Sequence, residues 1–454
     1  MDNHDKILEE KKFDLSMKKQ IKLGIVCLAR KTFDFQTAYQ IYHKLIGKLK
    51  NIESVKWEII ENLIIEVEDA KKSAENLAGK QIDALICISG TFALGHLILE
   101  LNKTIQRPIL LWGLKELPYD GGRIRLNSVC GINLNASNLY KAGVKNFYIT
   151  IGDEVDEDWI DAIRIIKAFS QAHVGIIGSR AHGFFNLDVD ELNLFEEVGV
   201  LLDYYQLSDV FNQNIDYHKL EERKDQINSL FDLSDLNSSQ IEKVAELILK
   251  FEAFMESNQL TSIAVRCWPE FADKFGISPC ASMSILQSEG KILTCEGDIL
   301  GSLSMIAHQA IGGETPYLAD FSQVDFEKDF GLLWHCGVAP CNLWDGKCER
   351  ALDSYFAGGK GVTADFVMKS GRFSMLRIDY TPGSYRVFIQ SGDAIPMDKE
   401  LKGTYAKIKF SDHISKVLDK IIYNGIAHHI SVVYGNYIRP LEIFAKIKGW
   451  KVIK

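Results

Sequence analysis

Three segments of this 454-residue chain stand apart because they place carboxylates or histidines of the kind that bind metal ions in largely apolar surroundings. Glu270 lies in RCWPEF, Glu296 and Asp298 flank a glycine in TCEGD, and the pair His428 and His429 lies in GIAHHISVVYG. A carboxylate at the end of a buried strand is costly unless its charge is compensated, and a divalent cation compensates it directly. Two carboxylates and one imidazole suit Mn²⁺, Mg²⁺ or Co²⁺, with open positions for hydroxyl oxygens. The three segments together predict a cleft that binds a metal ion.

Each segment also has a simpler interpretation when it is taken alone. Glu270 is spaced to pair with Arg266, and the two acids of TCEGD are placed to cap the helix expected after them. A pair of adjacent histidines is more often a core or surface pair than a ligand pair. Gly297 lets the backbone turn, so that either acid of TCEGD can face a cleft. It is the combination of the three segments that favours a metal site.

The elements that position these residues follow from hydrophobic periodicity. Residues 1–170 alternate apolar, strand-like runs such as IKLGIVCLAR with helical stretches, which predicts a parallel sheet covered by helices on both faces. A second alternation predicts a similar domain over 171–313. Over 314–454, short β-rich runs alternate with Gly, Pro and Asp turns, which predicts an antiparallel, barrel-like domain. The expected fold class is α/β: two Rossmann-like, doubly wound domains followed by a β-rich C-terminal domain.

Two arginines follow predicted strands, where ligands of parallel sheets usually bind. Arg30 and Arg180 are candidates for binding an anionic group of a substrate, and ordinary surface or helix-end arginines are the alternative. Three glycine clusters, SGTFALGH, GSRAHGF and AGGKGVT, lack the spacing of a phosphate-binding loop and are interpreted as tight turns.

Composition excludes several classes of function. The net charge of −9 and the sequence pI of about 5.7 argue against a general nucleic-acid binder. No run approaches the roughly 18 apolar residues of a membrane span, and the N-terminus lacks the pattern of a signal peptide, so no membrane partner and a cytoplasmic location are expected. The nine cysteines include no CxxC pair, and we expect them to be reduced thiols.

The order of WPEF, CEGD with its helix, HCG, and a late HH followed by YG resembles the L-fucose isomerase/L-arabinose isomerase superfamily, chiefly its shorter fucose-isomerase-like members. The resemblance is strongest over 261–345 and 424–452. It implies an aldose–ketose isomerase in which a divalent metal, commonly Mn²⁺, binds neighbouring oxygens of a sugar. Acidic residues then move a proton between C1 and C2 through a cis-enediol, with a metal-assisted hydride shift as the variant.

By motif, the resemblance makes Glu270 a metal ligand and candidate base, Asp298 a ligand and candidate acid, and His429 the third ligand. The arabinose-isomerase branch has a glutamate as its second carboxylate, so Glu296 is the alternative to Asp298. That branch also uses a further histidine, for which His335 in LLWHCG is the nearby candidate. The expected substrate-binding residues are therefore Arg30, Arg180, His335, Glu296 and His428, the last as a group that orients the site.

The expected substrate is a free sugar such as L-fucose, D-arabinose or a sulfoquinovose-like aldose. Relatives assemble as trimers or hexamers, so the resemblance also implies a homo-oligomer. Two other functions fit the same sequence: a sugar-binding or sensor module without turnover, and a metal-dependent sugar lyase or aldolase. Assay of a ketose product after incubation with Mn²⁺ and a panel of aldoses separates the three.

Overall fold

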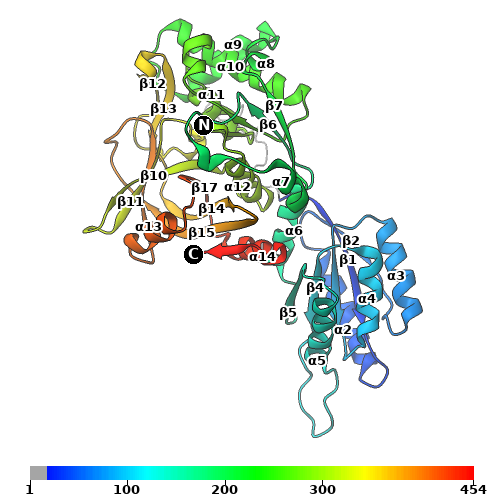
Figure 1. The fold of residues 1–454 in the computed structure, drawn as a ribbon. Helices are drawn as coiled ribbons and strands as arrows, with labels where there is room; N and C mark the ends of the chain where they lie inside the picture. Colours follow the sequence, from blue (N-terminus) through cyan, green and yellow to red (C-terminus); the bar gives the residue numbers. More distant parts are fainter. Residues whose placement is uncertain (1–17) are drawn as a thin grey trace, which may run out of the picture. The chain divides into compact units, whose positions relative to one another are not determined.

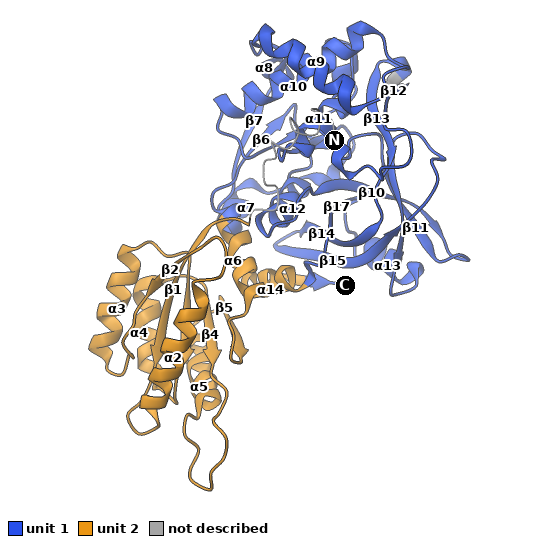
Figure 2. Cartoon of the chain, turned by 180° about the vertical axis from the view of Figure 1, so that it is seen from behind, with its two compact units in different colours: residues 1–17, 168–438, 452–454 blue, residues 18–167, 439–451 orange. Residues whose placement is uncertain are grey.

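The computed structural model describes residues 18–454, except for the side chains of residues 356 and 357. The first 17 residues of the expected first domain lie outside this description. The described chain forms two compact units: unit 2 contains residues 18–167 and 439–451, and unit 1 contains residues 168–438 and 452–454 (Figure 2). The boundaries of the three expected domains stay predictions. No helix among the described residues is long and apolar enough to cross a membrane.

Unit 2 is built on a five-stranded parallel sheet with the strand order β2-β1-β3-β4-β5 (Figure 1). Its strands are β1 (Ile21–Leu28), β2 (Val55–Ile59), β3 (Ala84–Ser89), β4 (Ile109–Gly113) and β5 (Phe147–Ile151). Alternate strand residues such as Val26, Leu85 and Leu111 form one core with the helices α3, α4 and α5. The helices of this unit are α2 (Phe35–Leu49), α3 (Val67–Gly79), α4 (Gly95–Ile105), α5 (Ser128–Lys141), α6 (Glu157–Phe169) and α14 (Ile438–Lys448).

Unit 1 contains a second parallel sheet, with the strand order β7-β6-β8-β9. Its strands are β6 (His173–Ile177), β7 (Leu201–Tyr205), β8 (Ser262–Val265) and β9 (Ile292–Thr294). β7 and β8 lie on opposite sides of β6, so the strand order reverses between β6 and β8. The carboxyl ends of the strands at such a reversal form the crevice where α/β sheets usually bind ligands. The helices are α7 (Glu191–Val198), α8 (Leu207–Phe211), α9 (Tyr217–Leu230), α10 (Ser238–Ser257), α11 (Cys280–Ser288) and α12 (Ile299–Ala310).

The remaining strands form one nine-stranded sheet in the order β12-β13-β16-β11-β10-β17-β14-β15-β18. An additional pairing between β15 and β16 closes the six strands from β16 to β15 into an antiparallel barrel. The fold class expected from the sequence is therefore confirmed. The strands are β10 (Tyr317–Asp325), β11 (Phe330–His335), β12 (Ala351–Phe356), β13 (Gly361–Val367), β14 (Gly371–Thr381), β15 (Ser384–Ile395), β16 (Thr404–Phe410), β17 (His429–Tyr434) and β18 (Lys451–Ile453), with helix α13 (Ile414–Tyr423) before β17.

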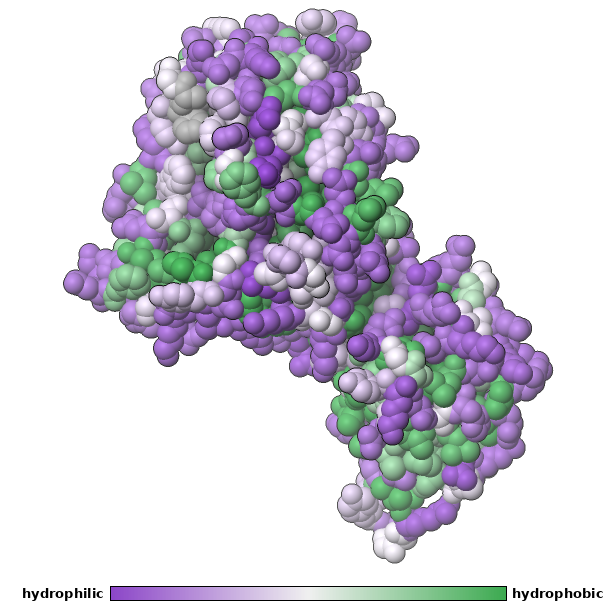
Figure 3. Space-filling view, viewed as in Figure 1, coloured by the Kyte–Doolittle hydropathy of each residue, from purple (hydrophilic) through white to green (hydrophobic). Residues whose placement is uncertain are grey.

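Helix α12 joins the second parallel sheet to the barrel. It packs against β8 and β9 on one side and against β14 and β17 on the other. All but one of its residues are therefore buried, which explains why ILGSLSMIAHQA shows no polar face. The face seen in Figure 3 is, by contrast, mostly hydrophilic over unit 1, with apolar side chains in small groups.

The junction between β9 and α12 is a sharp turn made by Glu296 and Gly297. Both residues have left-handed backbone angles, with φ of 63° and 75°. A Cβ atom on Gly297 would lie 2.6 Å from the Cα of Arg180 and 2.7 Å from the carbonyl oxygen of Ser179, which is closer than real Cβ atoms approach. Position 297 therefore requires glycine for two reasons, the left-handed backbone angle and the close approach of the neighbouring chain segment.

Replacement of Gly297 by alanine should lower the free energy of unfolding by about 2 to 5 kcal/mol, because a left-handed alanine and a backbone clash add together. The matched control is Gly383→Ala, where φ is also positive, at 79°, but no atom lies within 4 Å of the added Cβ. This control should cost only about 1 to 2 kcal/mol. Equal losses in the two variants, measured by urea unfolding, would contradict this account.

Helix α12 also contains a fully buried histidine. Burial lowers the pKa of His308 to about 3, whereas a histidine in the unfolded chain has a value near 6.5. The unfolded chain therefore binds the extra proton as the pH falls below about 6.5, and unfolding becomes easier by up to about 1.4 kcal/mol per pH unit. We expect the free energy of unfolding, measured with urea between pH 7 and pH 4.5, to fall less steeply with decreasing pH in His308→Gln than in the wild type. The exposed His218→Gln should keep the wild-type slope, and an unchanged slope in His308→Gln would refute the assignment.

Candidate metal centre and its surroundings

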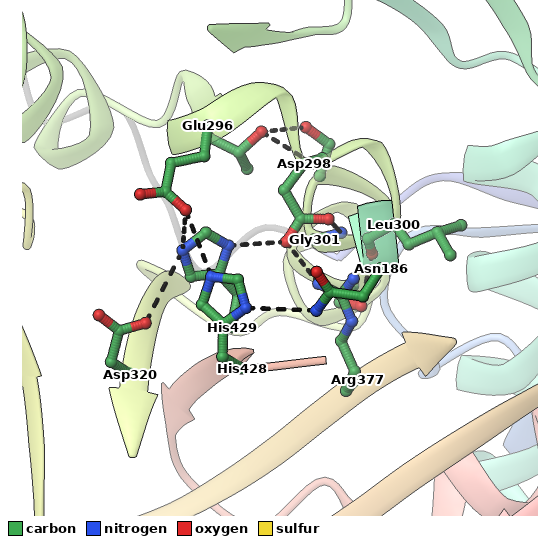
Figure 4. A network of polar contacts seen from close by, with 12 residues as sticks. Asn186, Glu296, Asp298, Leu300, Gly301, Asp320, Arg377, His428 and His429 are labelled. Atoms are coloured by element: carbon green, nitrogen blue, oxygen red, sulfur yellow. Dashed lines mark hydrogen bonds and ion pairs between the residues drawn. The ribbon is translucent and has the colours of Figure 1, made fainter. Parts of the chain in front are cut away.

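Three side chains from two distant segments meet where α12 approaches the barrel. Glu296 comes from the turn after β9, His428 precedes β17, and His429 is the first residue of β17. A carboxylate oxygen of Glu296 and one ring nitrogen from each histidine all lie within 4.8 Å of one another. The Oε2 atom of Glu296 lies 3.2 Å from Nε2 of His428 and 3.4 Å from Nε2 of His429 (Figure 4). The structure thus brings together two of the segments singled out in the sequence, TCEGD and the histidine pair.

A second carboxylate reaches the same ring from the neighbouring strand. Asp320 on β10 is directly opposite His429 on β17 in the antiparallel register, so both side chains lie on one face of the barrel. Its Oδ1 atom lies 3.7 Å from Nε2 of His429. That oxygen is buried and has no hydrogen-bond partner among residues 18–454. Sequence reasoning missed Asp320, although an acid within the apolar run YLADF was a usable signal.

His335 lies beside His429 at the end of β11. The two rings are stacked, with 5.7 Å between their centroids. Nδ1 of His335 accepts the backbone N–H of Cys336 at 2.9 Å, so the proton of the neutral ring lies on Nε2. Burial lowers the pKa of His335, which keeps the ring neutral. Its Nε2–H is a buried donor without a partner among the described residues, and such a group usually serves a ligand or a water.

Asp298 lies on the opposite side of the His429 ring. Its Oδ1 accepts the backbone N–H of Gly301 at 2.8 Å and caps α12, which confirms the simpler interpretation of this acid. Its Oδ2 accepts from Arg377 at 2.5 Å and from Nδ1 of His429 at 2.9 Å. The imidazole of His429 is therefore held between Asp298 at Nδ1 and Glu296 at Nε2.

The charges of this cluster shift the pKa values of its members. Burial alone would raise the pKa of Glu296, but the hydrogen bond to His428 and the charge of His429 bring it below its ordinary value. Burial would likewise raise the pKa of Asp298, but Arg377 and His429 hold it well below its usual range. For His429, burial lowers the pKa, and the surrounding carboxylates more than reverse this effect. The ionised carboxylates of Glu296 and Asp298 thus favour a positive charge on or beside the His429 ring.

Aromatic and amide side chains surround the outer edge of the cluster. Nε1 of Trp268 donates to Oε1 of Glu296 at 3.3 Å. The centroid of the Phe184 ring lies 5.2 Å from the centroid of the His428 ring and 6.2 Å from that of Trp268. Asn186 lies 3.4 Å from Nδ1 of His428. The side chain of His428 is 37% exposed, whereas that of His429 is 1% exposed. The cluster therefore opens to solvent on the His428 side.

Glu270 is engaged elsewhere. It forms an ion pair with Arg266 at 2.8 Å, the contact expected from their spacing. Among the described residues, the group of ligand atoms within 4.8 Å of one another does not include Glu270. Its Oε2 atom is nevertheless buried and lacks a hydrogen-bond partner among residues 18–454.

A cavity of about 360 Å³ lies at the carboxyl ends of the parallel strands of unit 1. Two arginines line it: Arg180 follows β6 and Arg266 follows β8. The backbone of Arg180 packs against Gly297, and the N–H of Ala181 donates to the carbonyl of Glu296 at 2.9 Å, so this cavity shares a wall with the candidate metal centre. The other lining residues are Ile176, Ser179, His182, Leu187, Asp188, Tyr204, Gly297 and Ile299.

Arg30 lies in unit 2, just beyond the end of β1. Its backbone N–H donates to the hydroxyl of Thr91 at 2.8 Å, at the carboxyl edge of the five-stranded sheet. Its proposed role in binding an anion stays a prediction from the sequence.

Comparison with known proteins matches both ends of the chain to isomerase families. Residues 24–171 match the fucose/sulfoquinovose isomerase N-terminal domain, and residues 339–454 match the L-fucose isomerase C-terminal domain. A periplasmic solute-binding protein from Actinobacillus succinogenes with bound D-allose aligns with 65% of this chain and 90% of its own. Its identity is 13% and its TM-score is only 0.18, so the likeness indicates no shared function.

Curated relatives match over nearly the whole length. A sulfoquinovose isomerase from Priestia aryabhattai is 28% identical over 92% of this chain and 95% of the relative. Another from Alkalicoccus urumqiensis is 26% identical over 82% of this chain and 86% of the relative. A third, from Clostridium sp. (strain MSTE9), is 23% identical over 89% of this chain and 92% of the relative. With its two family domains and its sheet-and-barrel fold, the chain belongs to the fucose isomerase-like family and is an aldose–ketose isomerase.

Proposed function

We propose that the chain isomerises a free aldose to a ketose with the help of a divalent metal ion held by Glu296, Asp320 and His429. The observation that carries this proposal is the convergence of two carboxylate oxygens on one imidazole nitrogen. Nε2 of His429 lies 3.4 Å from Oε2 of Glu296 and 3.7 Å from Oδ1 of Asp320. Adjacent ligands that bind one ion at about 2.1 Å lie roughly 3 to 4 Å apart, so each carboxylate oxygen already lies at ligand spacing from Nε2. Asp320 lies outside the group of atoms that are all within 4.8 Å of one another, so a cation would have to draw its Oδ1 toward Glu296.

The donor set favours a hard ion. Two carboxylates and one imidazole suit Mn²⁺, with Mg²⁺ or Co²⁺ as alternatives, and leave positions free for sugar oxygens. The unpartnered Oδ1 of Asp320 supports this set, because a buried carboxylate oxygen without a hydrogen bond is costly unless a cation or a proton binds it. His428 is the competing third ligand, which would give one carboxylate and two imidazoles. Its exposed ring beside Phe184 fits better a role in orienting the site or contacting the sugar.

The residues of the chain have distinct tasks in the proposed reaction. A bound cation would supply Lewis acidity next to the reacting oxygens of the sugar. The Nε2–H of His335 is free to donate to a sugar oxygen and so to fix the substrate's orientation. A carboxylate then removes the C2 proton and returns it to C1, which gives the cis-enediol route, and a hydride shift remains the variant. Glu270, whose Oε2 is buried without a hydrogen-bond partner among residues 18–454, stays the predicted base from the family motif.

We further propose that the substrate is an anionic aldose, with sulfoquinovose as the first choice. The relatives that match over most of the chain are named sulfoquinovose isomerases. The cavity beside the metal centre offers Arg180 and Arg266, whose guanidinium groups suit a sulfonate. L-Fucose and D-arabinose are the neutral alternatives.

The sequence-based expectations of a homo-oligomer and a cytoplasmic location stay predictions. Exposed apolar side chains on the edge strand β5, Ile149 and Ile151, support the expectation of an oligomer. An exposed apolar edge strand is a surface that another chain often covers.

The metal and its ligands are tested together by Mn²⁺ binding and turnover. Chelation should abolish ketose formation, and added Mn²⁺ should restore it. Glu296→Gln, Asp320→Asn and His429→Gln should each weaken Mn²⁺ binding by more than the 10- to 100-fold that loss of an orienting partner costs. Asp325→Asn, at the far end of the same strand β10, is the control and should bind normally.

His428→Gln should weaken Mn²⁺ binding less than tenfold if Asp320 is the third ligand. If His428→Gln weakens Mn²⁺ binding more than Asp320→Asn does, His428 is the ligand instead. Full turnover in metal-free protein would rule out the metal-dependent reaction.

The anionic substrate is tested by comparing sulfoquinovose with L-fucose and D-arabinose. Arg180→Gln should lower kcat/KM for sulfoquinovose by about 10- to 100-fold, because a hydrogen bond to a charged group contributes about 1.5 to 3 kcal/mol. Turnover of a neutral sugar, where detectable, should change little. Arg372→Gln, an exposed arginine on β14, is the matched control. Equal losses on charged and neutral sugars, or preferred turnover of a neutral sugar by the wild type, would refute this assignment.

A further inference from the structure

Asp298 and Arg377 form an ion pair that is completely buried beside the metal centre. Both side chains are 0% exposed, and the Nη1 and Oδ2 atoms lie 2.5 Å apart. Burying two charges costs more than the pair alone usually recovers, so a buried ion pair needs a reason other than stability. The third partner of Asp298 is Nδ1 of His429, at 2.9 Å, which connects the pair directly to the proposed ligand.

The carboxylate of Asp298 is already occupied on both oxygens. Oδ1 accepts from the backbone N–H of Gly301, and Oδ2 accepts from Arg377 and His429 (Figure 4). Among the described residues, the group of atoms placed to hold a cation includes Glu296 and both histidines but not Asp298. Binding of a cation by Asp298 would therefore require it to give up the helix cap or one of its two side-chain partners.

The hydrogen bond to Asp298 decides which nitrogen of His429 is available. An ionised carboxylate can only accept, so Nδ1 of His429 must carry the proton. The lone pair of the neutral ring is then on Nε2, which faces Glu296 at 3.4 Å and Asp320 at 3.7 Å. Partners of this kind fix the tautomer and the ring orientation of metal-binding histidines.

Arg377 stabilises the negative charge of the Asp298 carboxylate, which is buried away from water. Nε and Nη2 of Arg377 are buried and have no hydrogen-bond partner among residues 18–454, so the charge of the guanidinium is directed mainly to Asp298. Arg377 also lies on β14, which pairs with β17, the strand that begins with His429. The ion pair thereby connects the start of α12 to the barrel strands that carry the proposed ligands.

We propose that Asp298 and Arg377 are positioning residues: Asp298 holds the Nδ1–H of His429 so that Nε2 faces the cation, and Arg377 holds Asp298 in place as an anion. This inference rests on the proposed metal site and assigns Asp298 a role next to the ligands instead of among them. The opposite assignment, Asp298 as a ligand, predicts the opposite effect of removing Arg377. Loss of the arginine would then free Oδ2 and tighten metal binding.

The first measurement is the dissociation constant of Mn²⁺ for the full-length protein, followed by the electron paramagnetic resonance signal of the free ion. Asp298→Asn keeps an N-cap for α12 but presents an amide N–H to His429, so Mn²⁺ binding should weaken about 10- to 100-fold. Arg377→Met should also weaken binding, and Arg377→Lys should restore most of it. Arg372→Met removes an exposed ion pair from the same strand and should leave binding unchanged.

The second measurement needs no metal. In protein labelled with ¹⁵N-histidine, at pH 9, the His429 ring should carry its proton on Nδ1 in the wild type and on Nε2 in Asp298→Asn. The His429→Gln variant identifies the signal. This spectrum also decides the inference where Arg377→Met fails to fold, because Asp298→Asn and Arg377→Lys retain a polar group at each position.

The outcomes separate the two proposals. Absence of Mn²⁺ binding by the wild type would refute the metal site, while the tautomer of His429 would still test the positioning role. Normal Mn²⁺ binding by Asp298→Asn within about threefold, an unchanged tautomer, or tighter binding by Arg377→Met would each overturn the positioning role.

Discussion

The imidazole of His429 lies between carboxylates on both of its nitrogens, and the rest of the centre depends on this arrangement. Asp298 contacts Nδ1, while Glu296 and Asp320 approach Nε2. The ring has almost no exposure to solvent, so water cannot screen these charges. Three acids around one ring would repel one another, and Arg377 offsets only one of them. A cation on the Nε2 side, or a second proton on the ring, would balance the remaining charge.

The two architectures of unit 1 meet at this ring. The parallel sheet contributes Glu296 and Asp298 through the turn that precedes α12, and the barrel contributes Asp320, His335 and His429 from three adjacent strands. Helix α12 packs against both, which explains why a helix with so little polar surface lies at the centre of the unit. Its fully buried environment also makes the turn at Gly297 intolerant of change, because the chain at Ser179 and Arg180 fills the space where a side chain would project.

Much of the fold followed from local patterns in the sequence, because buried parallel strands, amphipathic helices and β-rich runs between turns have different periodicities. Part of the site followed too: TCEGD and the histidine pair converge. Asp320 did not, because its proximity to His429 arises from antiparallel register between strands more than a hundred residues apart. Asp298 shows a second limit. A helix-capping acid and a ligating acid look the same in a sequence, and only the contacts with Gly301 and Arg377 reveal how its oxygens are used.

The register of the barrel also determines which changes in chain length the centre can tolerate. Asp320 is opposite His429, and its other neighbour in the sheet is Trp334, next to His335. Side chains of a strand alternate between the two faces, so inserting or deleting a single residue within β10 or β17 would turn one of these groups to the other side of the barrel wall. Length variation among related chains should therefore accumulate in the connecting loops, leaving these two strands uniform in length.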